Sequence, residues 1–480
     1  MGRISSEGLK FDLFINGNWV EGKKKIDVYN PYNNQVIGIV SEADENDIDK
    51  AVGSAKDSFQ KFKDTPLYLR ASFLRKISEK LTERKEEIAR TITLESGKAI
   101  RFSTGEVDRA VETFKFAADE AEKLSGETVP LDAARGGVNR IGFYIRVPIG
   151  PVVAITPFNF PLNLAAHKIA PALAAGDTVI WKPSTFTPLT AGLFAEIIQD
   201  LGMPEGVFNV IFGPGDTVGD KLIKNKDIKL ISFTGSPVVG KKLRNISGMK
   251  KTLLELGSNS ALVVDEGVEN LEDVVDRAII GSYANAGQVC ISIQRIYAHS
   301  SIFEKFSHLF VEKTKEIKIG DPLDPEVLYG PMITEAEAIR AEEWIKEALE
   351  MGARPLLLGE RRGAMYTPTV LTDVNFDMKV VSREVFAPVV SIMPFDTIDQ
   401  AIDMVNHSEY GLNVGIYTQS ISNMMKAIKG CEVGSIVIND YPTFRVDNMP
   451  YGGVKMSGMG REGPPFAIEE YTEIRFVAIK

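Results

Sequence analysis

Residues 151–182 read PVVAITPFNFPLNLAAHKIAPALAAGDTVIWK, and this stretch decides the predicted fold. Two short apolar runs, 152–156 and 178–181, flank an apolar segment at 162–175 that is long enough for a helix. Strands of about five residues that alternate with helices of about 10–15 residues indicate βαβ units and a parallel sheet.

The same rhythm continues along the chain. It predicts a helix over 189–201, strands at 207–211 and 229–233, and a further helix that begins near Asp216. Because parallel sheets bind ligands at the carboxyl ends of their strands, the residues that follow these strands should share one rim. Those residues are Thr156, Lys182, Phe212, Gly213, Phe233 and Thr234.

The regions on either side differ from this pattern. A second α/β region runs from about 258 to 430, and the first 120 residues are predicted as mostly helical after a short extended segment. Residues 122–147 lie between the first 120 residues and the βαβ region. They contain glycines and a proline before an alternating segment at 143–147, which predicts an exposed β-ribbon. Such a ribbon is either an arm that pairs with a partner or an ordinary surface hairpin.

The composition of the 480-residue chain excludes several classes of protein. Apolar residues make up 44% and charged residues 25%, as in globular proteins and unlike disordered, collagenous or coiled-coil chains. The net charge of −10 argues against non-specific binding to nucleic acid or to an anionic membrane. No apolar run reaches the ~18 residues of a membrane helix, and the N-terminus lacks a signal-peptide core. We expect neither a nucleic-acid nor a membrane partner.

The cysteines and histidines also limit the function. Two cysteines, Cys290 and Cys431, are too few for a disulfide framework and fit a reducing compartment, so we expect a cytoplasmic protein. The four histidines have no metal-ligand spacing among themselves or with the cysteines, and we therefore expect no metal site.

Three side chains are candidates for catalysis. Cys290 is either a buried small hydrophobe or, as a thiolate, a nucleophile. No histidine lies in a partner motif, so the candidate base is Glu255, whose apolar setting indicates either a structural ion pair or a raised pKa suited to proton transfer. Asn159, which lies between two prolines, either caps a turn or donates to a developing oxyanion.

Two glycine-containing turns are candidates for binding phosphate. The segment 213–219, GPGDTVG, departs from G-x-G-x-x-G because its last glycine comes one residue late. Gly235 and Ser236 stand between a strand and a helix, where free N–H groups could face a pyrophosphate. Ser236 could equally be an ordinary helix cap.

Taken together, seven motifs follow one another in an order that resembles the aldehyde dehydrogenase superfamily. Two further segments, AHKIAP at 166–171 and FRVDNMPY at 444–451, are similar in particular to the lactaldehyde and glyceraldehyde dehydrogenase branch. The resemblance covers essentially the whole chain. The seven motifs are TPFNFP (156–161), KPS (182–184), FTGS (233–236), ELG (255–257), GQVC (287–290), EVFAP (384–388) and PYGGVK (450–455).

This resemblance implies a domain organisation. A Rossmann-like cofactor-binding domain would be formed by residues 1–121 and 148–256, and a second α/β domain, the catalytic one, by residues 257–440. The ribbon at 122–147 would be an oligomerisation arm. Residues 441–480 would form a return segment and a C-terminal oligomerisation strand. The resemblance therefore implies a homo-oligomer, either a dimer or a tetramer.

The resemblance also implies a mechanism. Cys290 would attack an aldehyde to form a thiohemiacetal, hydride would leave for NAD or NADP, and Glu255 would activate the water that hydrolyses the thioester. Asn159 and the backbone N–H of Cys290 would form the oxyanion hole, and Lys168 would belong to a proton relay. The implied cofactor-binding residues are Thr156, Pro157, Lys182, Ser184, Thr185, Gly215, Phe233, Gly235, Ser236, Glu384 and Phe386.

Three residues depart from the family's pattern. Thr185 stands where many NAD-preferring members have a glutamate that binds the 2′-hydroxyl, so we expect NADP to be accepted. Ser258 stands where a second glycine is usual, and it either restricts Glu255 or the nicotinamide or is a quiet structural change. Phe158 replaces a common tryptophan, which we interpret as neutral packing.

The substrate is implied by two arginines. Arg109 resembles an arginine that meets the substrate in phosphate-accepting relatives, but Val289 stands where those relatives have a second arginine. One arginine suits a hydroxyl or a carboxylate better than a doubly charged phosphate. We therefore expect a short hydroxyaldehyde such as lactaldehyde or glyceraldehyde. Arg445 is a second candidate contact, and for both arginines a structural salt bridge is the alternative.

Other functions stay open at this point. Non-phosphorylating glyceraldehyde-3-phosphate dehydrogenase and succinic semialdehyde dehydrogenase are the enzymatic alternatives. A CoA-acylating enzyme is disfavoured because Glu255, the base needed for hydrolysis, is present. A non-catalytic member of the family is the remaining alternative.

Overall fold

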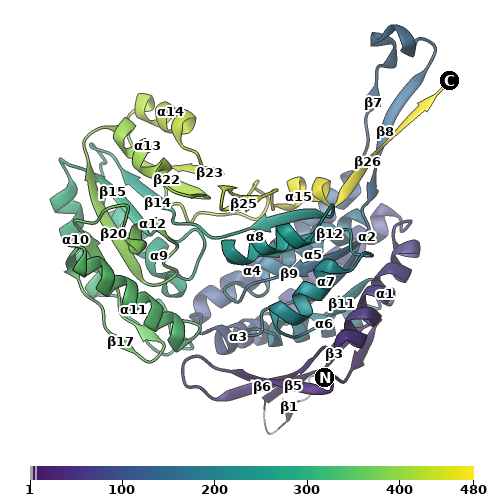
Figure 1. The fold of residues 1–480 in the computed structure, drawn as a ribbon, viewed down its shortest axis with the longest axis horizontal. Coiled ribbons are helices and arrows are strands. Elements are labelled where there is room, and N and C mark those ends of the chain that lie inside the picture. The colour runs from purple at the N-terminus through teal and green to yellow at the C-terminus, as the bar shows by residue number, and fades with distance from the viewer. Residues whose placement is uncertain (1–3, 6–7) are drawn as a thin grey trace.

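The computed structural model describes residues 4–5 and 8–480. The chain forms two α/β bodies, each with its own sheet and apolar core, and a thin arm that projects from the first body (Figure 1). The first core joins residues between Phe11 and Leu256 to Ala467, Ile468 and Tyr471 near the C-terminus. The second core lies between Ala261 and Ala427, so the end of the chain returns to the first body.

The sheet of the first body has the strand order β25-β13-β12-β9-β10-β11-β3-β4. Its five central strands are parallel, and the sequence predicted four of them. The strands are β9 (Pro151–Ile155), β10 (Thr178–Lys182), β11 (Phe208–Val210), β12 (Leu230–Thr234) and β13 (Lys251–Glu255), with β3 (Leu13–Ile15), β4 (Asn18–Val20) and β25 (Gly458–Met459) at the antiparallel edges.

The helices between these strands also match the prediction. α5 (Asn163–Ala175) follows β9, and α6 (Leu189–Asp200) follows β10. Near Asp216 the chain forms a short π-helical turn at Gly215–Gly219, which continues into α7 (Asp220–Lys224), and α8 (Pro237–Ile246) follows β12.

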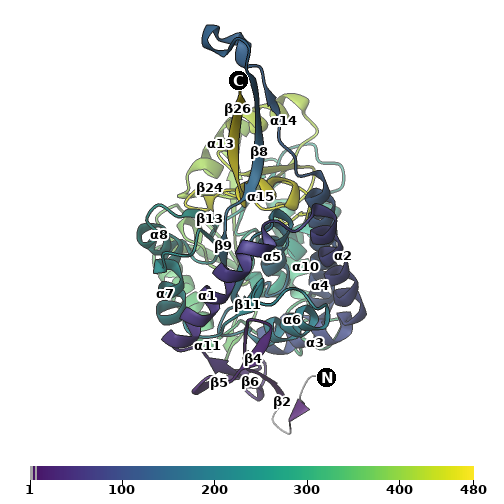
Figure 2. The same ribbon diagram turned by 90° about the vertical axis from the view of Figure 1, so that its right-hand side faces the viewer.

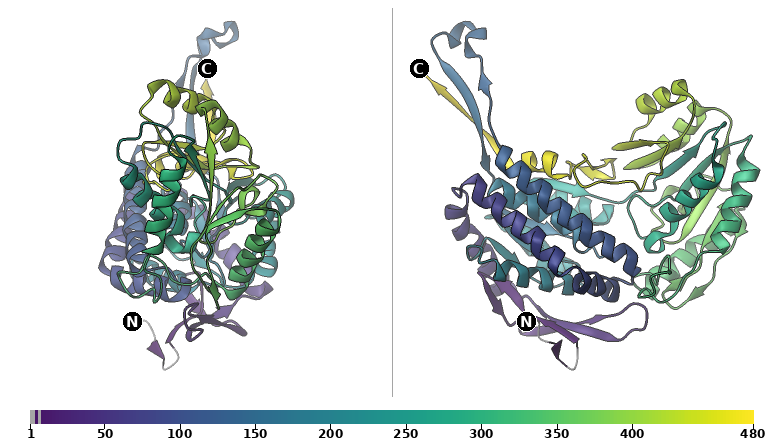
Figure 3. Two further views of the ribbon diagram at one scale, coloured as in Figure 1. Left: turned by 90° about the vertical axis from the view of Figure 1, so that its left-hand side faces the viewer. Right: turned by 180° about the vertical axis from the view of Figure 1, so that it is seen from behind.

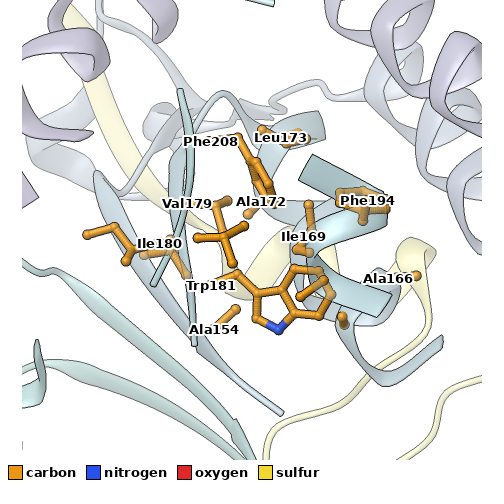
Figure 4. Close-up of a cluster of buried hydrophobic side chains, with 14 of the residues drawn as sticks. Ala154, Ala166, Ile169, Ala172, Leu173, Val179, Ile180, Trp181, Phe194 and Phe208 are labelled. Carbon is orange, nitrogen blue, oxygen red and sulfur yellow. The ribbon is translucent and has the colours of Figure 1, made fainter. Parts of the chain in front are cut away.

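The central segments of the first body carry no polar stripe because they are buried in its core on all sides. α5 is buried along its whole length, as are β9 and β10. Trp181 packs edge-on against Phe194, with ring centroids 5.8 Å apart, and Phe194 packs against Phe208 at 5.5 Å (Figure 4). Burial of such aromatic side chains contributes strongly to the stability of a core.

The first 120 residues begin with more strand than the sequence predicted. A separate four-stranded sheet has the order β1-β2-β6-β5, and the predicted helices come after it. α2 and α4 pack side by side on the first body (Figure 3). The strands are β1 (Ile4–Ser5), β2 (Gly8–Phe11), β5 (Lys24–Tyr29) and β6 (Val36–Glu42), and the helices are α1 (Glu45–Phe62), α2 (Leu67–Glu83), α3 (Lys85–Ser96) and α4 (Ile100–Lys123).

The second body has a seven-stranded sheet of order β16-β19-β20-β15-β14-β22-β23, parallel except for β16. The strands are β14 (Ala261–Val264), β15 (Arg295–His299), β16 (Arg354–Leu357), β19 (Thr369–Thr372), β20 (Val389–Phe395), β22 (Asn413–Tyr417) and β23 (Ser435–Ile438). Its longer helices are α9 (Leu271–Tyr283), α10 (Phe303–Lys315), α11 (Glu335–Glu350), α13 (Ile398–Asn406) and α14 (Ile421–Gly430).

The arm is a three-stranded antiparallel sheet that projects beyond both bodies (Figure 2). It is formed by β7 (Thr128–Val129), β8 (Ile141–Pro148) and the C-terminal strand β26 (Thr472–Ile479). The predicted ribbon is therefore present, and the C-terminal strand pairs with it. The arm exposes five large apolar side chains, those of Ile141, Ile145, Ile474, Phe476 and Ile479.

Residues 4–5 and 8–480 lack two features that bear on membranes and metals. None of the helices in these ranges is both long and apolar enough to cross a membrane. The same residues contain no group of three or more His, Cys, Asp or Glu side chains that could hold a metal ion.

Candidate active site

The carboxyl ends of the parallel strands form the rim that the sequence predicted. Lys182 pairs with Ile155, and Thr234 pairs with Glu255. Thr156, which follows β9, accepts a hydrogen bond at its Oγ1 from the indole Nε1 of Trp181 on β10 (2.9 Å). β13 was not recognised in the sequence, and its register is what places Glu255 on this rim.

Cys290 follows a turn whose backbone is strained. The turn comes after α9, and Asn285, Ala286 and Gly287 all have positive φ, of 55°, 56° and 72°. Only glycine adopts this region without a steric cost, so the alanine in particular is held there by its surroundings. The thiol that the turn presents is partly buried, and its Sγ lies 3.0 Å from the hydroxyl of Tyr451.

The environment of Cys290 opposes formation of a thiolate. Burial raises the pKa of the thiol to about 11, and the nearby carboxylates of Glu384 and Glu255 also raise it. The hydrogen bond from Tyr451 and the positive charge of Arg445 act in the opposite direction. Because only the thiolate is a strong nucleophile, these two side chains bear on the reactivity of Cys290.

Asn159 connects the two bodies at this site. Its Nδ2 donates to the backbone carbonyl of Gln288, two residues before Cys290, at 2.9 Å. Its Oδ1 is buried and has no hydrogen-bond partner in the part of the chain that the structure describes. The side chain therefore does more than cap its own turn: it holds the turn that carries the candidate nucleophile.

Glu255 is buried at the end of β13. Its Oε2 has no hydrogen-bond partner among residues 4–5 and 8–480. Burial, and next the negative charge of Glu462, raise the pKa of Glu255 well above its usual range, while Lys168 and Arg445 oppose this rise. A raised pKa of this kind is suited to a general base that works near neutral pH.

Lys168 is not free, because Glu462 binds it. Lys168 Nζ lies 2.8 Å from Glu462 Oε1, and Arg445 Nη2 lies 2.9 Å from Glu462 Oε2. Burial opposes ionisation of Glu462, but the charges of Lys168 and Arg445 outweigh it and hold the pKa of Glu462 below its usual value. Lys168, Glu462 and Glu255 line a cavity of about 10 Å³, which has room for about one water molecule.

The contacts of Glu384 and Ser258 bear on the open question of why a serine follows Gly257. Glu384 Oε1 accepts from the backbone N–H of Ser258 at 2.9 Å, and burial raises the pKa of Glu384 to about 7. A side chain at Gly257 would place its Cβ 2.2 Å from Glu384 Oε2, so a larger residue there would displace the Glu384 carboxylate. The Ser258 hydroxyl contacts that of Ser260 at 3.1 Å, which favours the quiet structural interpretation of Ser258.

Several hydroxyls predicted to bind the cofactor are engaged in local structure. Ser236 Oγ accepts from the backbone N–H of Val239 (3.3 Å) and caps α8, and Ser184 Oγ accepts from that of Phe186 (3.2 Å). Thr185 lines a cavity of about 530 Å³ between the N-terminal sheet and the second body.

The remaining predicted cofactor residues lie at the rim or across from it. Lys182 is buried, its Nζ donates to the carbonyl of Pro183 at 2.9 Å, and burial lowers its pKa to about 8. Phe386 has φ of 52° and packs edge-on against Phe158, with ring centroids 6.1 Å apart. Pro157 follows β9, Gly215 starts the π-helical turn, Phe233 is buried in β12, and the N–H of Gly235 donates to the carbonyl of Glu255 at 3.0 Å.

Both predicted substrate arginines form salt bridges. Arg109 donates from Nε and Nη2 to the two carboxylate oxygens of Asp447, at 3.1 and 2.8 Å, and its side chain remains 30% exposed. Arg445 is buried against Glu462, and its Cζ lies 3.6 Å from the ring centroid of Tyr451. Arg445 thus lies behind Tyr451 rather than in open space.

Two residues of the site were missed at the sequence level. Tyr451 lies inside the quoted PYGGVK motif, so its position was visible but its contact with Cys290 was not. No sequence pattern around Glu462 marks it as part of the site, because its partner Lys168 is 294 residues away in the chain.

A comparison with known protein families shows which family the chain belongs to. The sequence model described as "Aldehyde dehydrogenase family" matches residues 19–477. The chain belongs to the aldehyde dehydrogenase family. It is therefore an aldehyde-oxidising enzyme, as the motifs predicted.

This aldehyde dehydrogenase is similar to named relatives over nearly its whole length. It is 46% identical to a 3-sulfolactaldehyde dehydrogenase of Priestia aryabhattai, covering 98% of both chains. It is 39% identical to a lactaldehyde dehydrogenase of Methanococcus aeolicus, covering 97% of this chain and 99% of the relative. A solved glyceraldehyde-3-phosphate dehydrogenase of Methanocaldococcus jannaschii, complexed with NADP, is 38% identical and has a TM-score of 0.91, covering 95% of this chain and 99% of that chain. The predicted resemblance is confirmed.

Proposed function

We propose that this enzyme oxidises a short 2-hydroxyaldehyde to its carboxylic acid with NAD or NADP. The single observation that carries the chemistry is that Asn159 holds the turn of Cys290 while Glu255 lies near enough for its charge to act on the thiol. The relatives named for lactaldehyde and 3-sulfolactaldehyde support the substrate class.

Each step of the proposed reaction is carried out by a different side chain of this protein. The Cys290 thiolate attacks the aldehyde carbon, and the oxyanion that forms receives hydrogen bonds from the second N–H of Asn159 and the backbone N–H of Cys290. Loss of hydride leaves a thioester on Cys290. Glu255 then takes a proton from the water that hydrolyses this thioester, and Lys168 and Glu462 pass the proton onward through the adjoining cavity.

The rim fits a nicotinamide dinucleotide, which supplies the hydride acceptor when bound. Three features support the fit: the strand ends of a parallel sheet, the electropositive N-terminal end of α8, and the half-buried Glu384 carboxylate beside Gly257. We assign the pyrophosphate to Gly235 and Ser236, the adenosine ribose to Lys182 and Ser184, and the nicotinamide end to Glu384 and Phe386. Thr156, Pro157, Gly215 and Phe233 complete the proposed cofactor site.

We further propose that NADP is accepted. Thr185 brings no carboxylate that would repel a 2′-phosphate, and Lys182 on the adjoining strand end is a cation. The relative from Methanocaldococcus jannaschii was solved with NADP, which supports this assignment.

Arg109 is the proposed recognition element for the substrate. Its Nε and Nη2 donate to Asp447. Among residues 4–5 and 8–480, Nη1 has no hydrogen-bond partner, so this group can donate to a ligand.

A second candidate class of substrate is the hydroxyaldehydes that carry an anionic group. The similarity to a 3-sulfolactaldehyde dehydrogenase favours this class, because a sulfonate would be attracted by Arg109 and, at longer range, by Arg445.

We propose that the arm mediates homo-oligomerisation. β26 already pairs with β8 along its whole length, and the three-stranded sheet exposes Ile474 and Phe476 on one face and Ile145 on the other. Exposed apolar side chains on a thin sheet are unfavourable in an isolated subunit.

The decisive assay measures reduced nicotinamide with each cofactor and a panel of aldehydes. The panel contains lactaldehyde, glyceraldehyde, glyceraldehyde 3-phosphate, 3-sulfolactaldehyde, succinic semialdehyde and benzaldehyde. We expect the highest kcat/KM among the three-carbon hydroxyaldehydes, and loss of turnover in Cys290→Ser but not in Cys431→Ser. A preference for benzaldehyde or succinic semialdehyde would overturn the substrate class, and an active Cys290→Ser would overturn the mechanism.

A further inference from the structure

We propose that Tyr451 is a catalytic residue whose hydroxyl donates a hydrogen bond to the Cys290 thiolate and thereby promotes its formation. The inference rests on the proposed role of Cys290 as the nucleophile. It adds a thiol-activating group that neither the cofactor nor Glu255 provides.

The first argument is geometric. The Tyr451 hydroxyl lies 3.0 Å from Cys290 Sγ, within hydrogen-bond distance for sulfur. Tyr451 is buried and packs with Val289, Ile291 and Leu412 around the thiol. The apolar surroundings strengthen a hydrogen bond to a charged sulfur, because water does not compete for the donor.

The second argument concerns which atom donates. Burial, and next the negative charge of an ionised Cys290, raise the pKa of Tyr451 well above its ordinary range; Glu255 adds to this rise and Arg445 opposes it. The phenol therefore keeps its proton when Cys290 loses its own. A protonated hydroxyl next to a thiolate can only donate to it, and hydrogen bonds to ionised acceptors are the strong ones.

The third argument is that other charged groups around the thiol do not replace this role. Glu255 on β13 and Glu384 before β20 both disfavour a negative sulfur. The favourable groups are Tyr451 and Arg445, and they act as one unit because the guanidinium stacks on the phenol ring. A cation over the ring makes the phenol hydroxyl a better donor, so Arg445 is a positioning residue that acts through Tyr451.

The backbone fixes this unit in place. The backbone N–H of Tyr451 donates to the carbonyl of Glu462 at 3.1 Å, and that of Glu462 donates back to the carbonyl of Tyr451. The Glu462 carboxylate in turn holds Arg445. The hydroxyl is therefore aimed at Sγ before any substrate arrives, which is the preorganisation that catalysis requires.

The test is the pH dependence of alkylation of Cys290 by iodoacetamide, followed by mass spectrometry of the peptide that contains it. Tyr451→Phe removes one oxygen and keeps the ring that Arg445 covers. We expect the alkylation midpoint of the full-length enzyme to rise by about one pH unit and the rate at pH 7 to fall about tenfold. Alkylation needs no turnover, so its result tests the role of Tyr451 apart from the proposed function. The proposed function is overturned by a different result, an active Cys290→Ser.

The matched control is Tyr297→Phe. Tyr297 is equally buried, its hydroxyl donates to the carbonyl of Met404 at 3.1 Å, and Arg295 lies 5.7 Å from its ring. We expect this variant to lose comparable stability and to leave the Cys290 midpoint unchanged. An unchanged midpoint in Tyr451→Phe, or equal shifts in both variants, would overturn the proposal.

Discussion

Asn159 donates a hydrogen bond from its side-chain amide to the backbone carbonyl of Gln288 (2.9 Å), and this bond joins the first body to the turn that carries Cys290. An asparagine amide has two N–H groups, so the bond to Gln288 fixes the amide plane and leaves the second N–H for an oxyanion. The same contact thus orients the nucleophile's turn and the predicted oxyanion donor.

Replacing Asn159 by aspartate should remove the donor while keeping the size of the side chain. We expect kcat to fall by about 10²–10³-fold, the range observed when one oxyanion donor is lost. KM for the aldehyde should change far less, because the donor acts on charge that develops in the transition state. Steady-state kinetics with lactaldehyde will check this, and a fall in kcat of less than about threefold would contradict the oxyanion role.

The raised pKa of Glu255 predicts a pH dependence for thioester hydrolysis. The base acts as a carboxylate, which is populated only above that pKa, so the hydrolysis rate should rise with pH and then level off. In Glu255→Gln the rise should disappear, with at least about a 10²-fold loss of steady-state turnover. Rapid-mixing experiments should still show one equivalent of reduced nicotinamide, because acylation of Cys290 does not need this base. Absence of the burst would place Glu255 in acylation instead.

Thr185→Glu should alter the choice of cofactor. A carboxylate near the 2′ position accepts a hydrogen bond from the hydroxyl of NAD and repels the phosphate of NADP. We expect the ratio of kcat/KM for NADP to that for NAD to fall at least about tenfold, which corresponds to roughly 1.4 kcal/mol. Thr185→Gln, equal in size and uncharged, is the control, and an equal effect of both substitutions would exclude the electrostatic explanation.

Asp447 should contribute strongly to stability. Burial opposes its ionisation, but the hydrogen bonds and charges of His167 and Arg109 outweigh that effect and hold the pKa of Asp447 well below its usual value. We expect Asp447→Asn to lower the free energy of unfolding by about 3–5 kcal/mol, as for other broken buried ion pairs.

The sign of the pH effect follows from the depressed pKa. The contribution of Asp447 is complete above the unfolded-state pKa of about 3.9 and declines as the pH falls toward the folded-state value. Urea unfolding monitored by fluorescence should therefore give a constant difference between the wild type and Asp447→Asn from pH 7 to about 5, and a smaller one below about 3.9. A difference that grows on acidification would be inconsistent with this ion pair.

The arm predicts the assembly state. Ile474→Asp places a charge on the exposed apolar face of β26, and we expect it to reduce the mass of the assembly measured by light scattering after gel filtration. Arg475→Asp puts the same charge on the opposite face, beside Ile145, since side chains alternate along a strand, and an unchanged mass for this variant would confine the interface to the face of Ile474 and Phe476. A monomeric wild type would contradict the assignment directly.

Local periodicity was sufficient for much of the fold. The runs at 152–156, 178–181 and 229–233 became β9, β10 and β12 because fully buried parallel strands consist of continuous apolar residues. β5 was missed because its mixed polar and apolar residues carry no such run, whereas β6 does contain an apolar run, at 36–40, that was not assigned to a strand. β13 was missed because its start, Lys251-Thr252, is polar.

The candidate site was predictable in part. Cys290, Glu255 and Asn159 were found through their motifs, and the structure brings Asn159 beside the turn of Cys290. The contacts of Tyr451 with Cys290 and of Glu462 with Lys168 join residues 161 and 294 positions apart, and no local pattern specifies such pairings. Arg445 was predicted as a substrate contact, yet its packing against Tyr451 depends on the same long-range return of the chain.

The carboxylate of Glu462 holds Lys168 with one oxygen and Arg445 with the other. Loss of Glu462 leaves Lys168 and Arg445 as two uncompensated buried cations, at a cost of about 3–5 kcal/mol. In evolutionary terms, position 462 cannot drift while both cations remain. A lineage that alters it must pass through a poorly folded ancestor or change positions 168 and 445 with it. This triad should therefore be inherited as a unit, even while the surrounding pocket adapts to new aldehydes.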